Sequence, residues 1–418
     1  MNSIKQYFSS FASYITIFFK WVLLALLVGV GAGAVGSVFH ILVDKVTHIR
    51  MENTWLIYLL PLAGVVISFI YAMCKKYGKL DTNRIIKALR TKDDIPLILV
   101  PLIFISTVIT HLFGGSAGRE GAALQIGGGL GYHTGRLFRL PMDDRKIMIM
   151  VGMSAVFTAV FGTPLTAAVF AIEVSSVGIM HYSALLPCVV SAFVASHIQK
   201  LFGLSPVKFS DVVIGGADAL TLLKIVALAA LCAVVSIVFC IAIKGAGKYF
   251  KKLAPNRYIK SFAGGALLVL LTVLTGTYDY NGAGMDIIEN ALSGNAHPEA
   301  FAIKILFTAI TIGAGFKGGE IIPAFFVGST LGCVAAPVLG IEASIGAAIG
   351  FVTFFCCVVN CPLASIMLAF EVFGGNSLMV FALCCAVGYM LSGNFSLYKS
   401  QKIVYSKLNE HYADVNEK

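Results

Sequence analysis

A series of apolar segments, each long enough to form a membrane helix or a large part of one, runs through nearly the whole chain. An α-helix needs about 20 apolar residues to cross a bilayer, and the first two segments, 15–43 and 55–74, satisfy this length. The others cover 95–113, 122–138, 147–174, 182–201, 220–243, 262–277, 300–315, 321–339, 345–373 and 378–391. With 58% hydrophobic and 12% charged residues over 418 positions, the chain is too apolar for a soluble domain. We therefore predict an all-α polytopic protein that crosses the cell membrane several times.

Several of these segments are too short, or too often interrupted by glycine and proline, to be simple upright spans. Broken and tilted helices of this kind are typical of transporters whose site lies near the middle of the bilayer. Irregular backbone at that depth is tolerated only where protein or a water-filled cavity surrounds it. The interruptions therefore predict where a binding site lies.

The formal net charge of +10 is concentrated in short polar connections. The basic residues of two such connections are Lys75, Lys76, Lys79, Arg84, Lys87, Arg90 and Lys92, and Lys248, Lys251, Lys252, Arg257 and Lys260. Basic loops are typical of the cytoplasmic side of membrane proteins, where they also contact anionic lipid headgroups. This explanation is favoured over nucleic-acid binding, so the lipid bilayer is the expected partner of these residues.

The ten cysteines and eight histidines show no spacing typical of a metal site or a hydrolytic enzyme. Most of the cysteines lie within apolar segments, where a buried thiol is the common state. We predict no metal, no cofactor and no enzymatic activity, which leaves a membrane-embedded enzyme as a weaker alternative. A cation carrier is also disfavoured, because few carboxylates lie in the apolar segments.

Residues 114–121, with the sequence GGSAGREG, form a glycine-rich break between two apolar segments. A helix that starts here leaves its first N–H groups without partners and carries partial positive charge. Glycines also let the backbone approach a ligand closely, so the break predicts an anion site. A carboxylate at membrane depth usually marks an ion or proton pathway, and Glu120 is such a group. The alternative is a structural ion pair between Glu120 and Arg119.

A second break covers residues 313–323, with the sequence GAGFKGGEIIP. Its adjacent glycines free the backbone, and Pro323 fits the first turn of a helix. The amides of Glu320 and Ile321 are then expected to point at an anion. Glu320 is a second carboxylate in an apolar setting, and its alternative role is an ion pair with Lys317.

Two stretches recur about 200 residues apart and in the same order. Residues 162–174, with the sequence GTPLTAAVFAIEV, resemble residues 360–372, with the sequence NCPLASIMLAFEV. Residues 118–131 likewise align with residues 319–332, with matching glycines at three positions. Two homologous halves predict a pseudo-twofold transporter or channel with its site where the halves meet. Whether the halves are inverted stays open.

The repeat places the first membrane half at residues 1–210, the second at 211–405 and a polar C-terminal tail at 406–418, with no further soluble domain. Glu173 and Glu371 end the repeated stretches and are interpreted as carboxylates that cap or brace neighbouring segments. A third motif, GNFSLYKSQ at residues 393–401, contains a tyrosine that could donate its hydroxyl to an anion. An interfacial tyrosine is the commoner case.

Together these motifs resemble the CLC family of chloride channels and anion/proton antiporters over nearly the whole chain. The sequence GREGA at 118–122 resembles the family motif G-[KR]-E-G-P, which makes Glu120 the equivalent of its gating glutamate. The sequence GEIIP at 319–323 resembles G-x-F-x-P, whose amides bind the central anion, and Tyr398 matches the anion-coordinating tyrosine. The resemblance implies a homodimer in which each subunit has its own pathway, built from two inverted halves with helix N-termini aimed at the anion.

Three departures from the family pattern resemble its fluoride/proton antiporter branch. The G-S-G-I-P motif is absent, and by position Thr82 or Asn83 would stand near the anion. Val174 occupies the place of the internal proton-relaying glutamate of other antiporters, and Glu320 lies inside the second anion-binding motif. Ile322 does not fit this branch, which often has threonine before the motif's proline.

The function implied is proton-coupled antiport of a halide, with fluoride favoured over chloride, and Glu120 and Glu320 as the gating and proton-coupling groups. The expected anion-binding residues are the donors of the motifs above: Gly118, Arg119, Glu320, Ile321, Tyr398, Thr82 and Asn83. Glu120 would compete with the anion when ionised and move aside when protonated. A CLC-type chloride channel, or a chloride/proton antiporter without strict fluoride selectivity, is the alternative.

Overall fold

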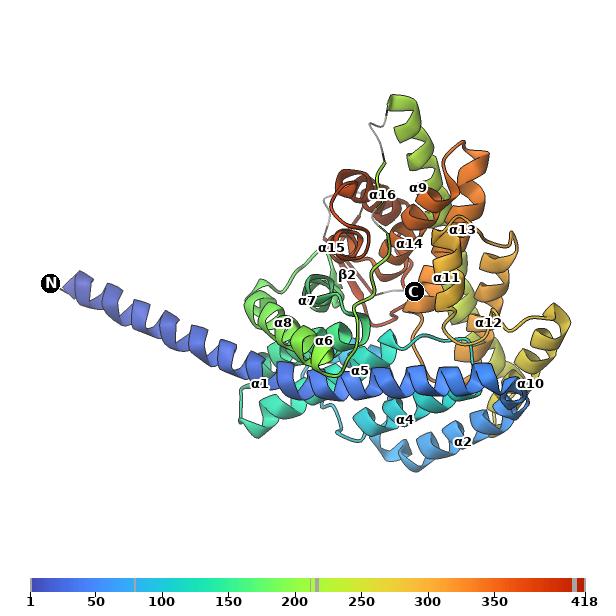
Figure 1. The fold of residues 1–418 in the computed structure, drawn as a ribbon. Helices are drawn as coiled ribbons and strands as arrows, with labels where there is room; N and C mark the ends of the chain where they lie inside the picture. Colours follow the sequence, from blue (N-terminus) through green and yellow to red (C-terminus); the bar gives the residue numbers. More distant parts are fainter. Residues whose placement is uncertain (1, 79, 211, 215–217, 408–411, 417–418) are drawn as a thin grey trace.

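The computed structural model describes residues 2–78, 80–210, 212–214, 218–407 and 412–416. Over these residues the chain is almost entirely helical, and the helices pack into one body from which the start of α1 (Asn2–Glu52) extends (Figure 1). Lys79, one of the basic residues named above, lies outside the described residues, as do 408–411, 417 and 418 of the predicted tail.

The helices follow one another in two series of the same order. The first series continues with η1 (Thr54–Leu59), α2 (Leu60–Met73), η2 (Lys75–Tyr77), α3 (Thr82–Ala88), α4 (Leu99–Leu112), α5 (Glu120–Leu137), α6 (Met142–Phe161), α7 (Pro164–Glu173), η3 (Tyr182–Ala184) and α8 (Leu185–Leu201). The second comprises α9 (Ala219–Leu253), α10 (Arg257–Thr275), α11 (Met285–Leu292), α12 (Ala300–Ala314), α13 (Ile321–Val338), α14 (Ala343–Val359), α15 (Pro362–Phe373) and α16 (Leu378–Leu391). Helices α12, α13 and α14 each begin about 200 residues after α4, α5 and α6.

Two apolar segments that we predicted as continuous are each divided into two helices. Segment 147–174 is divided between α6 and α7, and segment 345–373 between α14 and α15. Gly162 (φ 79°) and Asn360 (φ 56°) adopt the left-handed conformation that ends a helix. A proline two residues later starts the next helix, a position where its missing N–H costs nothing. The same device therefore breaks both segments at equivalent places.

Glycines bring the two helices of each central pair unusually close. A β-carbon on Gly127 of α5 would lie 2.2 Å from the carbonyl oxygen of Gly152 in α6. In the second series, a β-carbon on Gly328 of α13 would lie 2.4 Å from the carbonyl oxygen of Gly350 in α14. Small residues at such crossings let membrane helices pack backbone against backbone. The pairs α5–α6 and α13–α14 form the rigid centre of the fold.

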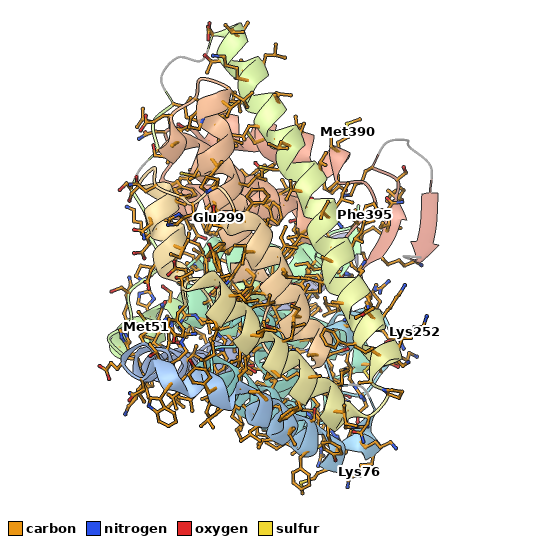
Figure 2. All side chains as sticks on the ribbon, turned by 90° about the vertical axis from the view of Figure 1, so that its right-hand side faces the viewer. Met51, Lys76, Lys252, Glu299, Met390 and Phe395 are labelled. Carbon is orange, nitrogen blue, oxygen red and sulfur yellow. The ribbon has the colours of Figure 1, made fainter. Side chains whose placement is uncertain are left out.

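Among the described residues, six helical stretches are long and apolar enough to cross a membrane: 13–52, 54–73, 182–201, 219–253, 257–275 and 321–338. The basic connections between them gather on one side. In Figure 2, Lys76 and Lys252 lie towards the right, whereas Met51 and Glu299 lie towards the left. The side that carries Lys76 and Lys252 is the one we expect to face the cytoplasm.

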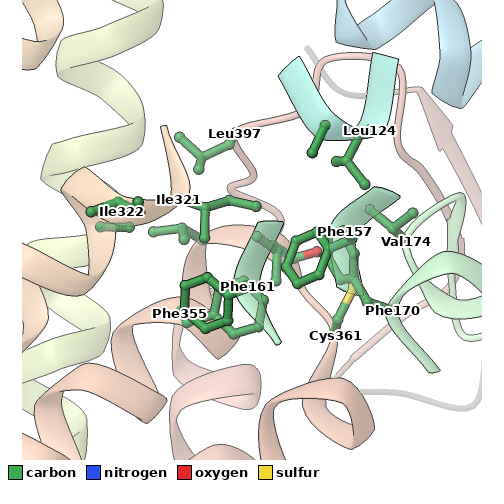
Figure 3. Packing of buried hydrophobic residues seen from close by; sticks show 14 of the residues in the cluster. Leu124, Phe157, Phe161, Phe170, Val174, Ile321, Ile322, Phe355, Cys361 and Leu397 are labelled. Atoms are coloured by element: carbon green, nitrogen blue, oxygen red, sulfur yellow. Dashed lines mark hydrogen bonds between the residues drawn. The ribbon is translucent and has the colours of Figure 1, made fainter. Parts of the chain in front are cut away.

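Phenylalanine rings from both series meet in the buried core (Figure 3). Phe161 of α6 lies 5.6 Å from Phe325 of α13, between ring centroids, and Phe170 of α7 lies 5.9 Å from Phe355 of α14. Offset aromatic pairs at this spacing add to the free energy of burial. Because Figure 3 also shows Ile321 beside these rings, the packing fixes the first turn of α13.

A small sheet accompanies the helices. β1 (Ser176–Val177) pairs in parallel with β2 (Lys402–Tyr405), which pairs in antiparallel fashion with β3 (Tyr412–Asn416). The sheet ties the chain after the 393–401 motif to the end of α7.

Candidate functional site

The two glycine-rich breaks meet in a short antiparallel bridge. The Gly118 N–H donates to the Gly319 carbonyl at 2.7 Å, and the Gly319 N–H donates to the Gly118 carbonyl at 2.6 Å. An antiparallel pair of this kind has local twofold symmetry, and the two residues occupy equivalent positions of the repeat. The bridge places the N-termini of α5 and α13 next to each other. It also uses the Gly118 N–H, so our expectation that this amide faces an anion is wrong.

A second reciprocal pair fixes the chain just before each helix. The Ser116 N–H donates to the Thr311 hydroxyl at 3.0 Å, and the Lys317 N–H donates to the Thr110 hydroxyl at 3.3 Å. Each threonine lies near the end of the helix, α4 or α12, that leads into the opposite break. Each break is therefore held in shape by the other half of the molecule.

Glu120 lies between the two helix N-termini and is completely buried. It is the first residue of α5, and its Oε2 accepts the Arg119 N–H at 3.1 Å. Ile322, in the first turn of α13, lies beside this carboxylate: a β-carbon on Gly118 would lie 2.6 Å from Glu120 Oε2 and 3.2 Å from the Ile322 nitrogen. Its other oxygen, Oε1, has no hydrogen-bond partner in the described residues. A carboxylate thus fills the space in which helix-terminal amides would receive an anion.

The Arg119 side chain points away from Glu120. Its Nη1 lies 2.5 Å from Asp44 Oδ1, and Asp44 Oδ2 lies 3.0 Å from Nε2 of His40. A buried guanidinium needs a counter-charge, and α1 supplies it. The alternative of an Arg119–Glu120 ion pair is therefore wrong, and Arg119 contacts the Glu120 carboxylate through its backbone N–H.

Glu320 caps the start of α13 and is half-buried. Its Oε2 lies close to Gly121, 3.6 Å from where a β-carbon on that glycine would be. The alternative of an ion pair with Lys317 is wrong, since the ion pairs among the described residues do not include it. The Lys317 ammonium instead lies 4.3 Å from the centroid of the Tyr71 ring. The Glu320 carboxylate is left facing the first turn of α5.

Tyr398 reaches the same region from a firmly anchored loop. Its side chain is 2% exposed, and its hydroxyl has no partner in the described residues. The carboxylates of Glu120 and Glu320 both lie near enough to influence this hydroxyl electrostatically. Gln401 holds the loop by donating from Nε2 to the carbonyls of Val174 and Val359, at 3.0 and 2.8 Å. A buried hydroxyl without a partner is costly unless a ligand supplies one.

The side chains of Thr82 and Asn83 contact different parts of the molecule. The Thr82 hydroxyl accepts a hydrogen bond from Gln125 Nε2 at 2.9 Å and donates to the Gly121 carbonyl at 3.4 Å. Thr82 therefore contacts the first turn of α5. Asn83 Oδ1 instead accepts the Ser400 N–H at 3.0 Å, so Asn83 supports the loop that carries Tyr398.

Gln125 is a site residue that sequence reasoning missed. It is 3% exposed, it also donates to the Gly121 carbonyl at 3.3 Å, and its Oε1 has no partner in the described residues. The available signal was a single amide side chain within the apolar, glycine-rich segment 122–138. No group of three His, Cys, Asp or Glu residues in the described part of the chain lies close enough to hold a metal ion.

Comparison with known proteins identifies the family. Residues 63–393 match the voltage gated chloride channel family. The "Chloride/fluoride channel protein" of Pseudomonas syringae pv. tomato is 36% identical over 398 residues, covering 93% of this chain and 87% of that protein. The H(+)/Cl(-) exchange transporter ClcA of Vibrio vulnificus is 25% identical, covering 97% of this chain and 92% of the transporter.

Solved structures agree with this assignment. The crystal structure of a CLC-type fluoride/proton antiporter superposes with a TM-score of 0.89 at 32% identity, covering 92% of this chain and 98% of that one. A slow cyanobacterial Cl−/H+ antiporter superposes with a TM-score of 0.74 at 21% identity, covering 89% and 94%, which shows the shared fold. The chain therefore belongs to the voltage gated chloride channel (CLC) family and is a multi-pass membrane protein with the CLC fold.

Proposed function

We propose that the protein exchanges a halide for protons across the membrane, with fluoride favoured over chloride. The observation that carries the proposal is the position of Glu120, whose carboxylate lies between the N-termini of α5 and α13 and accepts a backbone N–H there. An anion at the same place would be bound by the same kind of donor. Because the carboxylate and the anion exclude each other, proton binding and anion binding are coupled.

The anion would be held by helix-terminal amides and one hydroxyl. The first N–H groups of a helix have no partner within it, and those of Gly121 in α5 and of Ile321 and Ile322 in α13 belong to the two N-termini that the Gly118–Gly319 bridge brings together. The buried Tyr398 hydroxyl supplies a further donor. Protonated Glu120 has no negative charge with which to compete for these amides and moves aside.

Glu320 is the group that we assign to the inner proton step. It caps α13 beside Gly121, and its charge and that of Glu120 both act on Tyr398. A half-buried carboxylate in this position can exchange a proton with water on one side and with the Glu120 region on the other. Val174, at the place of the internal glutamate of other antiporters, cannot perform this step.

Fluoride is favoured because a small, strongly hydrated anion requires closely spaced donors to replace its water. Two helix N-termini and a tyrosine converge here, and two of the similar proteins are described as a chloride/fluoride channel protein and a fluoride/proton antiporter. A chloride/proton antiporter without strict fluoride selectivity is the second candidate, favoured by the likeness to the Vibrio vulnificus exchanger.

We further propose that the membrane halves are residues 1–210 and 211–405, followed by a polar tail at 406–418, and that two copies form a homodimer. The reciprocal bonds at Gly118 and Gly319 support two halves related by a twofold axis. Each subunit then contains a complete pathway, because both breaks come from one chain.

Flux from proteoliposomes tests the proposal. With a fluoride or chloride gradient and a pH readout, the wild-type protein should move protons uphill, and more strongly with fluoride. Glu120→Gln should abolish proton movement while anion flux persists. Glu52→Gln, at an exposed glutamate of α1, is the matched control and should behave as wild type. Uphill proton movement in Glu120→Gln would show that coupling does not depend on this residue.

A further inference from the structure

A cavity of about 430 Å³ opens on the side of the molecule opposite the basic connections. It lies between the end of α1, the end of α4 and residues 278–287, and Ile322 forms part of its wall. Ile322 also lies beside the Glu120 carboxylate, since a β-carbon on Gly118 would approach both Glu120 Oε2 and the Ile322 nitrogen, at 2.6 and 3.2 Å. The cavity is therefore next to the Glu120 site, on the approach from the face that carries Met51 and Glu299 (Figure 2).

Three residues that line this cavity each have a buried side-chain nitrogen with no hydrogen-bond partner in the described residues. These nitrogens are Nη1 of Arg50, Nε2 of His111 and Nε of Arg119. His111 is 1% exposed and Arg119 is 8% exposed. Burying a polar nitrogen without a partner is unfavourable, and more so when the group is charged. Three such nitrogens around one cavity point to a ligand that accepts hydrogen bonds and carries negative charge.

His111 can donate to that ligand only after it takes up a proton. Its Nδ1 lies 2.9 Å from the Thr107 carbonyl, so Nδ1 carries a hydrogen and donates it there. In the neutral ring Nε2 then has a lone pair and no hydrogen. Protonation turns Nε2 into a donor and adds a positive charge at the wall of the cavity. Binding an anion and charging His111 are therefore mutually favourable.

The charges that face His111 support this coupling. From α1 come Arg50 and Asp44, and from the start of α5 comes Arg119, whose charge is partly balanced by its ion pair with Asp44. Arg50 belongs to none of the ion pairs among the described residues, and Asp286 at the cavity wall is exposed to solvent. Without an anion, the two guanidinium groups repel a charged imidazole ring. An anion between them removes that repulsion.

Asp279 and His48 also line the cavity and are partly or fully exposed. Lys304 does not line it, and its buried ammonium is engaged by the carbonyls of Tyr280 and Gly282, at 3.2 and 2.8 Å. Arg50 Nη1, His111 Nε2 and Arg119 Nε therefore remain as the buried nitrogens of the lining residues that have no partner in the described residues.

We propose that this cavity is an outer halide site, in which the anion binds Arg50 and Arg119 and His111 takes up one proton as the anion arrives. The identity of the ligand as a halide rests on the proposed function. The site would hold an anion next to Glu120 before it enters the pathway, and it would bring a proton to the same place.

Proton uptake on adding halide tests the site without any transport measurement. The purified protein in weakly buffered detergent solution receives sodium fluoride or sodium chloride, and the pH change is recorded. All variants carry Glu120→Gln, which removes the proton that Glu120 itself would bind. The background variant should take up protons, E120Q/H111Q should take up about one proton fewer per subunit, and E120Q/H48Q, which alters the exposed histidine of the same cavity, should match the background. Equal uptake in E120Q/H111Q and E120Q/H48Q would overturn the proposal.

A second variant keeps His111 unchanged. Arg50→Gln removes a charged donor and should lower halide affinity, measured by calorimetry, at least about tenfold. Lys45→Gln removes an exposed charge from the same helix outside the cavity and should leave the affinity unchanged. Equal halide binding by both variants would also overturn the site. If wild-type vesicles move no halide while these uptake differences persist, the proposed function fails and the anion site stands.

Discussion

The Glu371 carboxylate, near the end of α15, accepts both the N–H and the hydroxyl of Thr166, in the first turn of α7, at 2.8 and 2.6 Å. Glu173, at the end of α7, accepts the N–H groups of Leu363 and Ala364, in the first turn of α15, at 3.2 and 2.9 Å. Each helix N-terminus is thus capped by the carboxylate that ends the equivalent helix. The interpretation of these two glutamates as capping groups is confirmed.

Replacing either glutamate with glutamine should destabilise the protein without changing the coupling of protons to anions. A charge-assisted hydrogen bond contributes about 1.5–3 kcal/mol, and glutamine retains only part of that interaction. We expect Glu173→Gln and Glu371→Gln to lower the melting temperature in detergent by several degrees. Glu289→Gln, on the exposed face of α11, should not lower it. Loss of proton coupling in Glu173→Gln, at an unchanged melting temperature, would mean that Glu173 carries protons.

The bridge between Gly118 and Gly319 should not tolerate a side chain. A β-carbon on Gly319 would lie 2.5 Å from the Gly121 nitrogen, and one on Gly118 would lie 2.6 Å from Glu120 Oε2. Because these neighbours are backbone and a buried carboxylate, Gly319→Ala should separate the two helix N-termini and abolish halide flux. Gly31→Ala and Gly245→Ala are matched controls, since no atom lies within 4 Å of their added carbons. Alanine favours a helix by about 1 kcal/mol over glycine, so both controls should be at least as stable as wild type.

Much of this site could be predicted because its residues carry local signals. A glycine-rich break followed by an apolar segment indicates an exposed helix N-terminus wherever it occurs, and both breaks have this form. The position of Glu120 at such a terminus followed from spacing alone. The two motifs recur in the same order in both halves of the chain, which also indicated that the two breaks meet where the halves pack together.

The parts that could not be predicted depend on contacts between distant segments. Nothing near Gly118 in the sequence shows that its N–H is used by Gly319, and nothing near Arg119 indicates Asp44, which comes from α1. Asn83 is adjacent to Thr82, yet it contacts Ser400 near the other end of the chain. The sequences Gly-Thr-Pro and Asn-Cys-Pro mark the points at which segments 147–174 and 345–373 are divided. Because the residues on both sides of each point are apolar, the pattern of apolar residues alone does not reveal the break.

Removing the Tyr398 hydroxyl should weaken anion binding and leave the fold intact. The hydroxyl has no partner in the described residues, so Tyr398→Phe breaks no hydrogen bond of the protein itself. The loss of one donor to a charged ligand corresponds to about 1.5–3 kcal/mol, or roughly tenfold or more in halide affinity by calorimetry. Tyr132→Phe is the contrasting variant. The Tyr132 hydroxyl donates to Asp94 Oδ1 at 2.5 Å, and this hydrogen bond lies away from the Glu120 site. We expect that variant to lose stability and keep its affinity, and a Tyr398→Phe protein with unchanged affinity would exclude this hydroxyl as a ligand.

The Gln125–Thr82 hydrogen bond should affect halide affinity through the position of Thr82. Gln125 Nε2 holds the Thr82 hydroxyl at 2.9 Å against the first turn of α5, where the Gly121 carbonyl is its second partner. Gln125→Met and Thr82→Val each break this contact, so each should raise the halide concentration for half-maximal flux. If the two residues act together, the double variant should be little worse than either single one, with a coupling free energy of about 0.5–3 kcal/mol. Thr134→Val is a suitable control, because among the described residues its hydroxyl bonds the Leu130 carbonyl within α5 and no residue of the Glu120 site. Fully additive effects of Gln125→Met and Thr82→Val would mean that Gln125 does not act on the anion through Thr82.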